Sequence, residues 1–275
     1  MTCEIHPTAQ VSPQAELGDR VQIGPFSVIG DEVSIGEETW VGPHTVIEGP
    51  TRIGKRNRIY GHSSLGTDPQ DLKFQGERTT LLIGDDNKIR EFVTLNRGTR
   101  GGIGRTVIGS RNLLMTAVHV AHDCEVHNDV ILANSATLAG HIVIGDFATV
   151  GAFTGVHQFC RVGVHAFIGG YSVLTRDALP FIKTVGVRRE ARIYGINTLG
   201  LKRREFSAAR IAALKSAYRV FFMKGFKVGE AIRRIRAQGL LSEDVETLVA
   251  FIETARRGFV RSLSEVEVEK AEAVL

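Results

Sequence analysis

An aliphatic residue returns at every sixth position through most of the first 174 residues of this chain. A period of six fits neither an α-helix, which repeats about every 3.6 residues, nor a long strand, which repeats about every two. It fits a solenoid in which short strands alternate with tight corners and each aliphatic side chain points inward. In 13 of the 26 positions the next residue is glycine, which permits the chain to turn. The positions are Ile5, Val11, Leu17, Ile23, Ile29, Ile35, Val41, Ile47, Ile53, Ile59, Leu65, Ile83, Ile89, Leu95, Ile108, Leu114, Val120, Val126, Leu132, Leu138, Ile144, Val150, Val156, Val162, Ile168 and Leu174.

Two segments interrupt this repeat. Residues 66–82 are polar, and residues 96–107 are rich in glycine and arginine. We expect both to be loops extruded from the solenoid, and loops on a rigid scaffold are where function tends to be found. Three six-residue units would close a triangular coil of 18 residues, so residues 18 apart in the sequence would stack in neighbouring coils, roughly 4.8 Å apart.

Beyond Pro180 the apolar spacing becomes helical. It predicts helices over 197–204, 208–223, 228–238 and 243–256, with Ser207 and Ser242 as N-caps. We therefore expect a β-solenoid domain over residues 1–182 and a small helical domain over residues 183–275. The acidic stretch at residues 262–275 is expected to be frayed.

The net charge of +4 is unevenly distributed. Residues 1–182 and residues 240–275 each carry a net charge of −4, whereas residues 183–239 carry 15 basic and 3 acidic side chains, a net charge of +12. Such a block favours an anionic partner: phosphate, nucleic acid, an acidic protein or an anionic lipid. The three cysteines have no Cys-x-x-Cys spacing, and no secretory signal or membrane-length apolar stretch is present, so we expect free thiols in a cytosolic protein without membrane insertion.

The segment HVAHDC, residues 119–124, places two histidines and an aspartate inside the apolar ladder. The 18-residue period would put Asp123 beside His141, and His122 beside Gly140. One corner column would then hold His119, His122, Asp123, Gly140, His141, His157 and Gln158.

A histidine beside a carboxylate can act as a general base, because the carboxylate fixes the imidazole tautomer and stabilises the imidazolium. No serine is clearly placed for a nucleophilic triad, and Cys124 is expected to turn away into the core. Direct activation of an incoming hydroxyl by the histidine is therefore the simpler interpretation.

Nine motifs in order along the chain resemble the family of acyl-[acyl-carrier-protein]–UDP-N-acetylglucosamine O-acyltransferases, which catalyse the first step of lipid A biosynthesis. The six-residue ladder alone is generic among acyltransferases, whereas HVAHDC, TLAGH, VHQFC and GLKRR together are specific. The resemblance implies a mainly β fold: a left-handed parallel β-helix of hexapeptide repeats followed by a small C-terminal α-helical domain. The motifs are PQDLK (69–73), REFVT (90–94), NRGT (96–99), NLLM (112–115), HVAHDC (119–124), ILAN (131–134), TLAGH (137–141), VHQFC (156–160) and GLKRR (200–204).

The resemblance also implies a reaction, the transfer of an (R)-3-hydroxyacyl chain from acyl carrier protein to the glucosamine 3-position of UDP-N-acetylglucosamine, without a cofactor or a metal. His122 would be the general base, Asp123 would orient it, and the backbone N–H of Gly140 would donate to the developing oxyanion. Substrate contacts would come from Gln70, Asp71 and Lys73 in the first loop, from His119, His141, His157 and Gln158, and from Asn197, Arg203 and Arg204 around uridine and phosphate.

The family's enzymes form trimers with the active site between subunits, so the resemblance implies a homotrimer. It also implies that the basic block attracts the acidic carrier protein. Gly170, with Gly169 before it, matches the members whose groove admits longer chains, so we expect a longer 3-hydroxyacyl group. Leu199 stands where the family often has an acidic residue.

Three alternatives stay open at this point. Related β-helices include γ-type carbonic anhydrases, which would use His119, His122 and His141 as zinc ligands. A trimeric scaffold whose basic tail binds nucleic acid is disfavoured, because few aromatic residues are interleaved with the basic block. An N-acyltransferase acting on an amino sugar would have the same fold. Asp71 with Lys73 could also be a surface ion pair, and Arg203 with Arg204 a solvated helix face.

Overall fold

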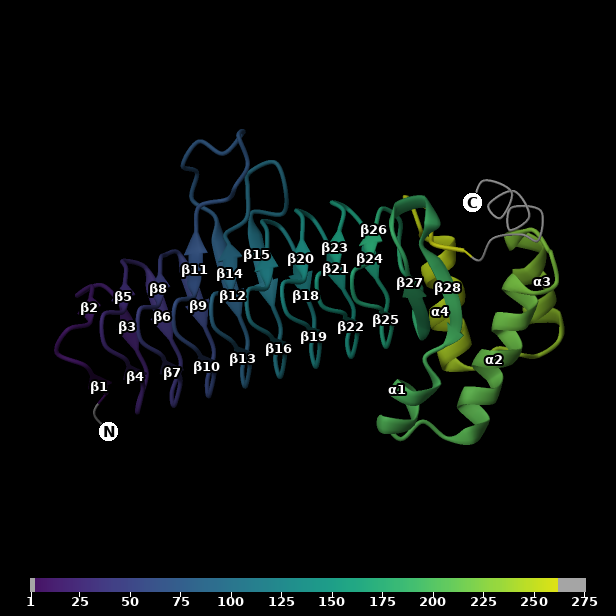
Figure 1. The fold of residues 1–275 in the computed structure, drawn as a ribbon, viewed down its shortest axis with the longest axis horizontal. Coiled ribbons are helices and arrows are strands. Elements are labelled where there is room, and N and C mark those ends of the chain that lie inside the picture. The colour runs from purple at the N-terminus through teal and green to yellow at the C-terminus, as the bar shows by residue number, and fades with distance from the viewer. Residues whose placement is uncertain (1–2, 262–275) are drawn as a thin grey trace.

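The computed structural model describes residues 3–261 and shows a long parallel β-helix with a cluster of helices at one end (Figure 1). Residues 262–275, expected to be frayed, lie outside the described residues. The strands are mostly two residues long and stack into three sheets that run along the solenoid. The predicted β-solenoid is therefore confirmed.

The first sheet has eleven strands and the second has nine. In stacking order the first contains β1 (Glu4–Ile5), β4 (Gln22–Ile23), β7 (Trp40–Val41), β10 (Arg58–Ile59), β13 (Lys88–Ile89), β16 (Leu113–Leu114), β19 (Ile131–Leu132), β22 (Thr149–Val150), β25 (Phe167–Ile168), β27 (Ile182–Val185) and β28 (Arg192–Ile196). The second contains β2 (Gln10–Val11), β5 (Val28–Ile29), β8 (Val46–Ile47), β11 (Ser64–Thr67), β14 (Thr94–Asn96), β17 (His119–Val120), β20 (Thr137–Leu138), β23 (Gly155–Val156) and β26 (Val173–Leu174).

The third sheet has eight strands. They are β3 (Glu16–Leu17), β6 (Val33–Ile35), β9 (Thr51–Ile53), β12 (Thr80–Ile83), β15 (Arg105–Ile108), β18 (Glu125–Val126), β21 (Val143–Ile144) and β24 (Arg161–Val162). All pairs in the three sheets are parallel except β27 with β28. The chain visits the sheets in rotation, so each coil has three corners.

The ladder residues form the core as predicted. From Ile23 to Leu174 every one of them is buried. Ile5 remains 46% exposed, because the first coil is covered on one side only. Strand register confirms the 18-residue period: Ile5 pairs with Ile23, and Val120 pairs with Leu138.

Apart from Gly66, which has a φ of 75°, the glycines that follow ladder residues have a different role from the one expected. At Gly24 and Gly36 the φ angle is not left-handed, but an added Cβ would lie 2.9 Å and 2.6 Å from backbone atoms of the next coil. Positive φ values occur instead two residues later, for example at Phe26 with a φ of 59°. These glycines therefore allow close stacking of coils, while non-glycine corner residues adopt the left-handed conformation.

Both interruptions are loops, and both are shorter than predicted. The first loop spans residues 68–79 because β11 continues to Thr67 and β12 begins at Thr80. The second loop spans residues 97–104, between β14 and β15. Extra strand residues such as Leu81, fully buried and paired with Thr51 and Thr106, account for the difference. Both loops rise from the corner that joins the second sheet to the third (Figure 1).

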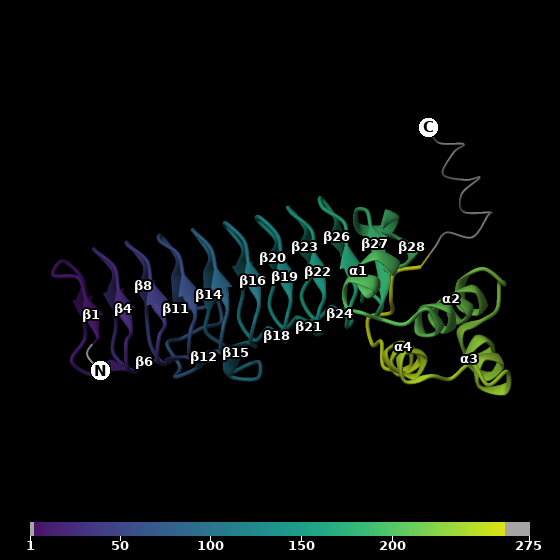
Figure 2. The same ribbon diagram turned by 90° about the horizontal axis from the view of Figure 1, so that it is seen from below.

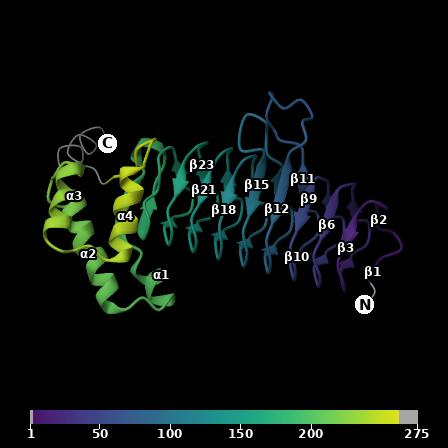
Figure 3. The ribbon, with the colours of Figure 1, turned by 180° about the vertical axis from the view of Figure 1, so that it is seen from behind.

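The four predicted helices are present as α1 (Thr198–Arg203), α2 (Ala208–Phe222), α3 (Val228–Ala237) and α4 (Glu243–Glu253), with a short 3₁₀ turn, η1 (Arg188–Glu190), before them. The side chains of Ser207 and Ser242 accept hydrogen bonds from the backbone of Arg210 and Val245, which confirms both N-caps. Helices α2, α3 and α4 gather beyond the last coil (Figures 2 and 3). The division expected at residue 182 falls at the start of β27, which still pairs with β25, so β structure continues to Ile196.

Candidate active site

One corner of the solenoid, which we call the histidine corner, joins the second sheet to the third at residues 121–124, 139–142 and 157–160. The His122 Nδ1 lies 2.8 Å from the Asp123 Oδ2. The His141 Nδ1 lies 4.0 Å from that oxygen, and the His122 and His141 rings meet edge to face with centroids 5.0 Å apart. The coil period thus brings together the residues that the sequence arithmetic placed side by side.

Gly140 lies directly against the His122 ring. A Cβ at this position would lie 2.6 Å from His122 Cε1 and 2.8 Å from Nε2, so glycine is needed for the ring to occupy its place. Within residues 3–261 the Gly140 N–H donates to no acceptor, which leaves it free for a bound group. On the next coil Phe159 stacks on His141, with ring centroids 4.4 Å apart.

The carboxylate of Asp123 is buried and held by the second loop. Its Oδ1 accepts hydrogen bonds from the backbone N–H groups of Ile103 (2.9 Å) and Gly104 (3.1 Å). Its Oδ2 accepts from the Thr99 hydroxyl at 2.6 Å as well as from His122, and the Thr99 N–H lies 3.1 Å from both oxygens.

These contacts set the protonation state of Asp123. Burial pushes the pKa of the Asp123 carboxyl upward, but the hydrogen bonds from His122 and Thr99 outweigh it and hold that pKa below its usual range. The group is therefore ionised at neutral pH. An ionised Asp123 fixes the His122 tautomer with its proton on Nδ1, so Nε2 is the basic nitrogen.

The sequence did not predict this cradle of loop donors. Thr99 belongs to the NRGT motif, yet nothing in the period shows that the second loop folds back over Asp123. Gly102 makes the approach possible, since a Cβ there would overlap the Asp123 carboxylate. The glycine density of residues 96–107 was the one available signal.

His119 lies on strand β17 and not in the corner turn where the sequence arithmetic placed it. Its ring points toward the preceding coil, where His119 Nδ1 lies 2.7 Å from the Thr94 hydroxyl. Burial lowers the pKa of His119, and a charge on His122 lowers it further. Burial also lowers the pKa of His141, although the Asp123 charge opposes this effect.

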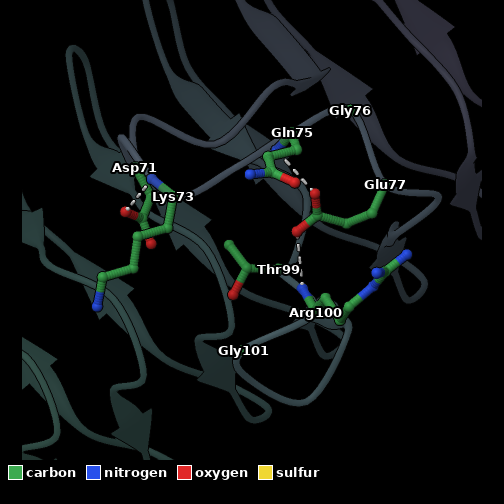
Figure 4. Close-up of a pocket in the computed structure, with 8 residues that line it drawn as sticks. All are labelled: Asp71, Lys73, Gln75, Gly76, Glu77, Thr99, Arg100 and Gly101. Carbon is green, nitrogen blue, oxygen red and sulfur yellow. Dashed lines mark hydrogen bonds between the residues drawn. The ribbon is translucent and has the colours of Figure 1, made fainter.

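A cavity of about 540 Å³ lies between the two loops, lined by Asp71, Lys73, Gln75, Gly76, Glu77, Thr99, Arg100 and Gly101 (Figure 4). The negative charge of Asp71 acts on His141, so this cavity adjoins the histidine corner. Lys73 donates its backbone N–H to the Asp71 carboxylate at 3.0 Å, and among the described residues no ion pair joins the two side chains, which disfavours the surface ion pair interpretation. Gln70 is exposed and does not line the cavity.

The other predicted substrate contacts are spread over the molecule. His157 and Gln158 are exposed on the histidine corner, two coils from His122. Gly170 is exposed at the corner between the first and second sheets. Arg203 and Arg204 lie at or just after the end of α1, on the edge opposite to the loops (Figure 1). One chain therefore does not bring all of these residues together.

Asn197 and Arg204 already have partners within the chain. The Asn197 Oδ1 caps α1 by accepting from the Gly200 N–H, and its Nδ2 donates to the His165 carbonyl. The Arg204 guanidinium lies 4.7 Å from the centroid of the Phe147 ring. Leu199 is 62% exposed and lines a surface pocket with Lys202.

The zinc triad His119, His122 and His141 is not assembled in this arrangement. The donor atoms that lie within 4.8 Å of one another belong to His122, Asp123 and His141. The Asp123 oxygens already accept from three backbone N–H groups, a hydroxyl and an imidazole, so the carboxylate has no lone pair left for a cation. These residues do not fit a metal site.

Comparison with solved structures defines the class of protein. The structure of LpxA from Acinetobacter baumannii matches with a TM-score of 0.89 and 41% identity, covering 94% of this chain and 99% of that one. The UDP-N-acetylglucosamine acyltransferase of Francisella novicida matches with a TM-score of 0.91 and 39% identity, covering 98% and 99%. The fold is thus a left-handed parallel β-helix with a small C-terminal helical domain, and the protein is an acyltransferase.

Sequence relatives then give the particular family. An acyl-[acyl-carrier-protein]–UDP-N-acetylglucosamine O-acyltransferase from Stenotrophomonas maltophilia (strain R551-3) is 51% identical over 94% of this chain and 97% of its own length. One from Burkholderia orbicola is 52% identical over 94% and 99%. The family described as "Udp N-acetylglucosamine O-acyltransferase; Domain 2" matches residues 177–260. The chain belongs to the acyl-[acyl-carrier-protein]–UDP-N-acetylglucosamine O-acyltransferase family.

This membership decides between the alternatives. It supports the O-acyltransferase over the zinc enzyme, the nucleic-acid scaffold and the N-acyltransferase.

Among residues 3–261 all three cysteines are unpaired, and burial raises the pKa of Cys124 to about 12, so this thiol is not a nucleophile. No helix in the described part of the chain is long and apolar enough to cross a bilayer.

Proposed function

We propose that this protein transfers an (R)-3-hydroxyacyl chain from the thioester of acyl carrier protein to the 3-hydroxyl of the glucosamine in UDP-N-acetylglucosamine, with His122 as the general base. The observation that carries the proposal is the pair formed by His122 and the buried, ionised Asp123, 2.8 Å apart. Because Asp123 occupies Nδ1, the Nε2 of His122 is the atom that takes the proton from the sugar hydroxyl.

The remaining steps follow from the same corner. The deprotonated oxygen attacks the thioester carbonyl, and the N–H of Gly140, free within residues 3–261 and beside the His122 ring, donates to the oxyanion that forms. Collapse of this intermediate breaks the carbon–sulfur bond, and His122 returns its proton to the departing thiolate. No metal and no cofactor takes part.

The sugar and the acyl region are assigned to the cavity between the loops, which Asp71 and Lys73 line and where the charge of Asp71 acts on His141. Gln70, His119, His157 and Gln158 supply the remaining contacts on this side. We propose that they are completed by Gly170, Asn197, Arg203 and Arg204 of a neighbouring copy in a homotrimer, because these four lie on other edges of their own chain. Symmetric closure around a three-fold axis would supply this neighbour to every site.

The carrier protein and the location are part of the same proposal. Residues 183–239 carry a net charge of +12, which favours an acidic partner, so activity should weaken as salt screens the attraction. The free thiols agree with a cytosolic enzyme.

The central test is an acyl-transfer assay with UDP-N-acetylglucosamine and a panel of 3-hydroxyacyl carrier proteins. His122→Ala should lower kcat on the order of a thousand-fold, because general base catalysis is lost. His127→Ala, which removes an exposed histidine outside the corner, is the matched control and should retain activity. A fully active His122→Ala enzyme would show that the base has been misassigned. A product restricted to short chains would exclude the longer acyl group expected from Gly170.

A mixing experiment tests whether the site is shared. His122→Ala and a double variant, Arg203→Ala with Arg204→Ala, are each expected to be nearly inactive. When the two are refolded together in equal amounts, random trimers should regain up to about a quarter of the wild-type activity, since one interface in four combines both intact halves. No recovery in verified mixed trimers would show that each site belongs to one chain.

A further inference from the structure

The second loop gives the carboxylate of Asp123 several hydrogen bonds in addition to the one that it accepts from His122. Five donors converge on this one side chain: the His122 imidazole, the Thr99 hydroxyl, and the backbone N–H groups of Thr99, Ile103 and Gly104. The exposed fraction of the Asp123 side chain is 0%. A carboxylate so enclosed has one orientation available to it.

Apart from the His122 imidazole itself, only one of these donors is a side chain, the Thr99 hydroxyl, and a substitution can remove it without changing the backbone. The Thr99 hydroxyl is 2.6 Å from Oδ2, the same oxygen that accepts from His122 Nδ1. Thr99 is itself buried, at 5% exposure. Its hydroxyl therefore shares this oxygen with His122 and fixes where the oxygen points.

Thr99 also joins the two halves of the site. It lines the cavity between the loops, together with Lys73 and Asp71 (Figure 4). Its neighbour Arg100 donates its backbone N–H to Glu77 of the first loop, at 3.0 Å. The hydroxyl of Thr99 is nevertheless turned to Asp123, so it is not available to a ligand in the cavity.

We propose that Thr99 is a positioning residue of the acyl transfer: its hydroxyl, with the backbone of the second loop, holds Asp123 so that His122 presents Nε2 to the acceptor hydroxyl. This inference rests on the proposed role of His122. The Thr99 hydroxyl is bonded to Asp123 and not directed at the reacting atoms, so it acts through Asp123. The second loop therefore contributes to catalysis by holding Asp123 in place.

The position of Gly102 independently shows that the second loop is shaped to close over Asp123. A Cβ at Gly102 would overlap the Asp123 carboxylate, so the loop closes over this group because residue 102 is glycine. Gly102→Ala should therefore open the cradle and reproduce the kinetic defect of losing the Thr99 hydroxyl.

Thr99→Val removes the hydroxyl and keeps the shape of the side chain. It should lower kcat roughly ten-fold, because misorientation of a catalytic group is costly, and change KM for the sugar nucleotide by less than about two-fold. Thr99→Ser keeps the hydroxyl and should restore most of kcat. Thr39→Val, which removes a buried threonine hydroxyl that donates to the Gly54 carbonyl at 3.0 Å, controls for a general loss of stability and should leave kcat unchanged.

The pH dependence separates positioning from simple damage. If the Thr99 hydroxyl holds Asp123 against His122, its loss weakens the contact between the carboxylate and protonated His122, so the acidic limb of kcat/KM against pH should move to lower pH in Thr99→Val. The other groups that face His122, namely His119, His141 and, through His141, Asp71, are unchanged in the variant. An unchanged or raised limb in a folded Thr99→Val enzyme would overturn the proposal.

A ¹⁵N titration of the His122 imidazole in wild type and Thr99→Val gives the same comparison without any turnover. The signal is assigned by its absence in His122→Ala. If His122→Ala keeps its activity, the proposed base is wrong, yet the titration still shows whether Thr99 acts on His122 through Asp123. A shift downward in Thr99→Val supports the positioning role, and an upward shift or identical titration curves contradict it.

Discussion

Two corners of the same solenoid use carboxylates in opposite ways. The corner between the third and first sheets, which we call the charged corner, carries the ion pairs Arg20–Glu38, Arg56–Asp86 and Arg111–Asp129, each joining neighbouring coils. All six side chains are exposed except that of Asp129, which is half-buried. At the histidine corner Asp123 occupies the equivalent left-handed position, with a φ of 58° against 57° at Asp129. The backbone is the same, and the surroundings differ.

The second loop makes that difference. At the charged corner solvent reaches each pair, so the pairs contribute little to stability. At the histidine corner the loop excludes water from Asp123 and replaces it with fixed donors, which is the preorganised arrangement that catalysis needs. The six-residue repeat supplies equivalent corner positions along the solenoid, and the second loop converts the one at Asp123 into part of the proposed active site.

The sharpest way to break this comparison is to neutralise one carboxylate at each corner. Asp123→Asn should lower kcat by on the order of a hundred-fold or more, because the amide no longer stabilises the His122 imidazolium and favours the wrong tautomer. Asp129→Asn removes a charge from the equivalent position and should leave kcat unchanged. Steady-state kinetics on both variants measure the effect, and equal losses would show that position in the coil matters more than the loop.

Gly140→Ala tests the packing of the His122 ring. The added Cβ would lie 2.6 Å from Cε1, so the ring must move while the backbone N–H at residue 140 stays in place. We expect kcat to fall roughly ten- to hundred-fold. Gly155→Ala, where an added Cβ meets nothing within 4 Å, is the control. Retained activity in Gly140→Ala would mean that the ring position is not critical.

His165, on the charged corner near the helical domain, predicts a pH effect on stability. Its ring stacks between Phe147 and Phe181, and burial, then the charge of Arg204, lowers its pKa to about 4. Because the folded state holds fewer protons than the unfolded state between pH about 6.5 and about 4, this contribution to stability is complete above the upper value and is lost as the pH falls.

The loss should amount to about 2 kcal/mol of unfolding free energy after allowance for the partial exposure of the ring. His165→Phe keeps the stacking and cannot be protonated. Denaturant unfolding at pH 7 and pH 4 should therefore show a smaller acid loss in His165→Phe than in wild type. Parallel losses in the two proteins would show that His165 does not titrate in this range.

The smallest effect is expected at the charged corner itself. Arg56→Ala breaks the bidentate contact with Asp86, but both side chains are more than one-third exposed. The melting temperature should stay within a degree or so of wild type. A drop of several degrees, measured by calorimetry, would mean that the ion pair contributes substantially to the stability of the solenoid.

The sequence predicts the repetitive part of the molecule well, because an 18-residue period converts sequence distance directly into contact. Asp123 beside His141 and Gly140 beside His122 follow from arithmetic alone. The period does not predict the contacts of residues outside the repeat, such as those in the two loops. The contact of Thr99 with Asp123 depends on how the second loop closes, and His119 was misplaced because a strand residue and a corner residue point in different directions.

The helical end shows a second limit. Sequence signals located its four helices and two serine caps. They could not show that the Asn197 side chain caps α1 and donates to the His165 carbonyl, or that Arg204 packs over Phe147. Both depend on how α1 docks against the last coils, which is tertiary packing that no local pattern encodes. The assignment of these residues to uridine and phosphate stays a prediction.

Chemical rescue of His122→Ala is the most direct test of the account. If the loop-held Asp123 makes His122 a general base, the alanine variant leaves a cavity that added imidazole can enter and use. The rate of acyl transfer to UDP-N-acetylglucosamine should then rise with imidazole concentration, while Asp123→Asn should gain nothing. A His122→Ala rate that stays flat, or equal rescue of both variants, would contradict the central role of this pair.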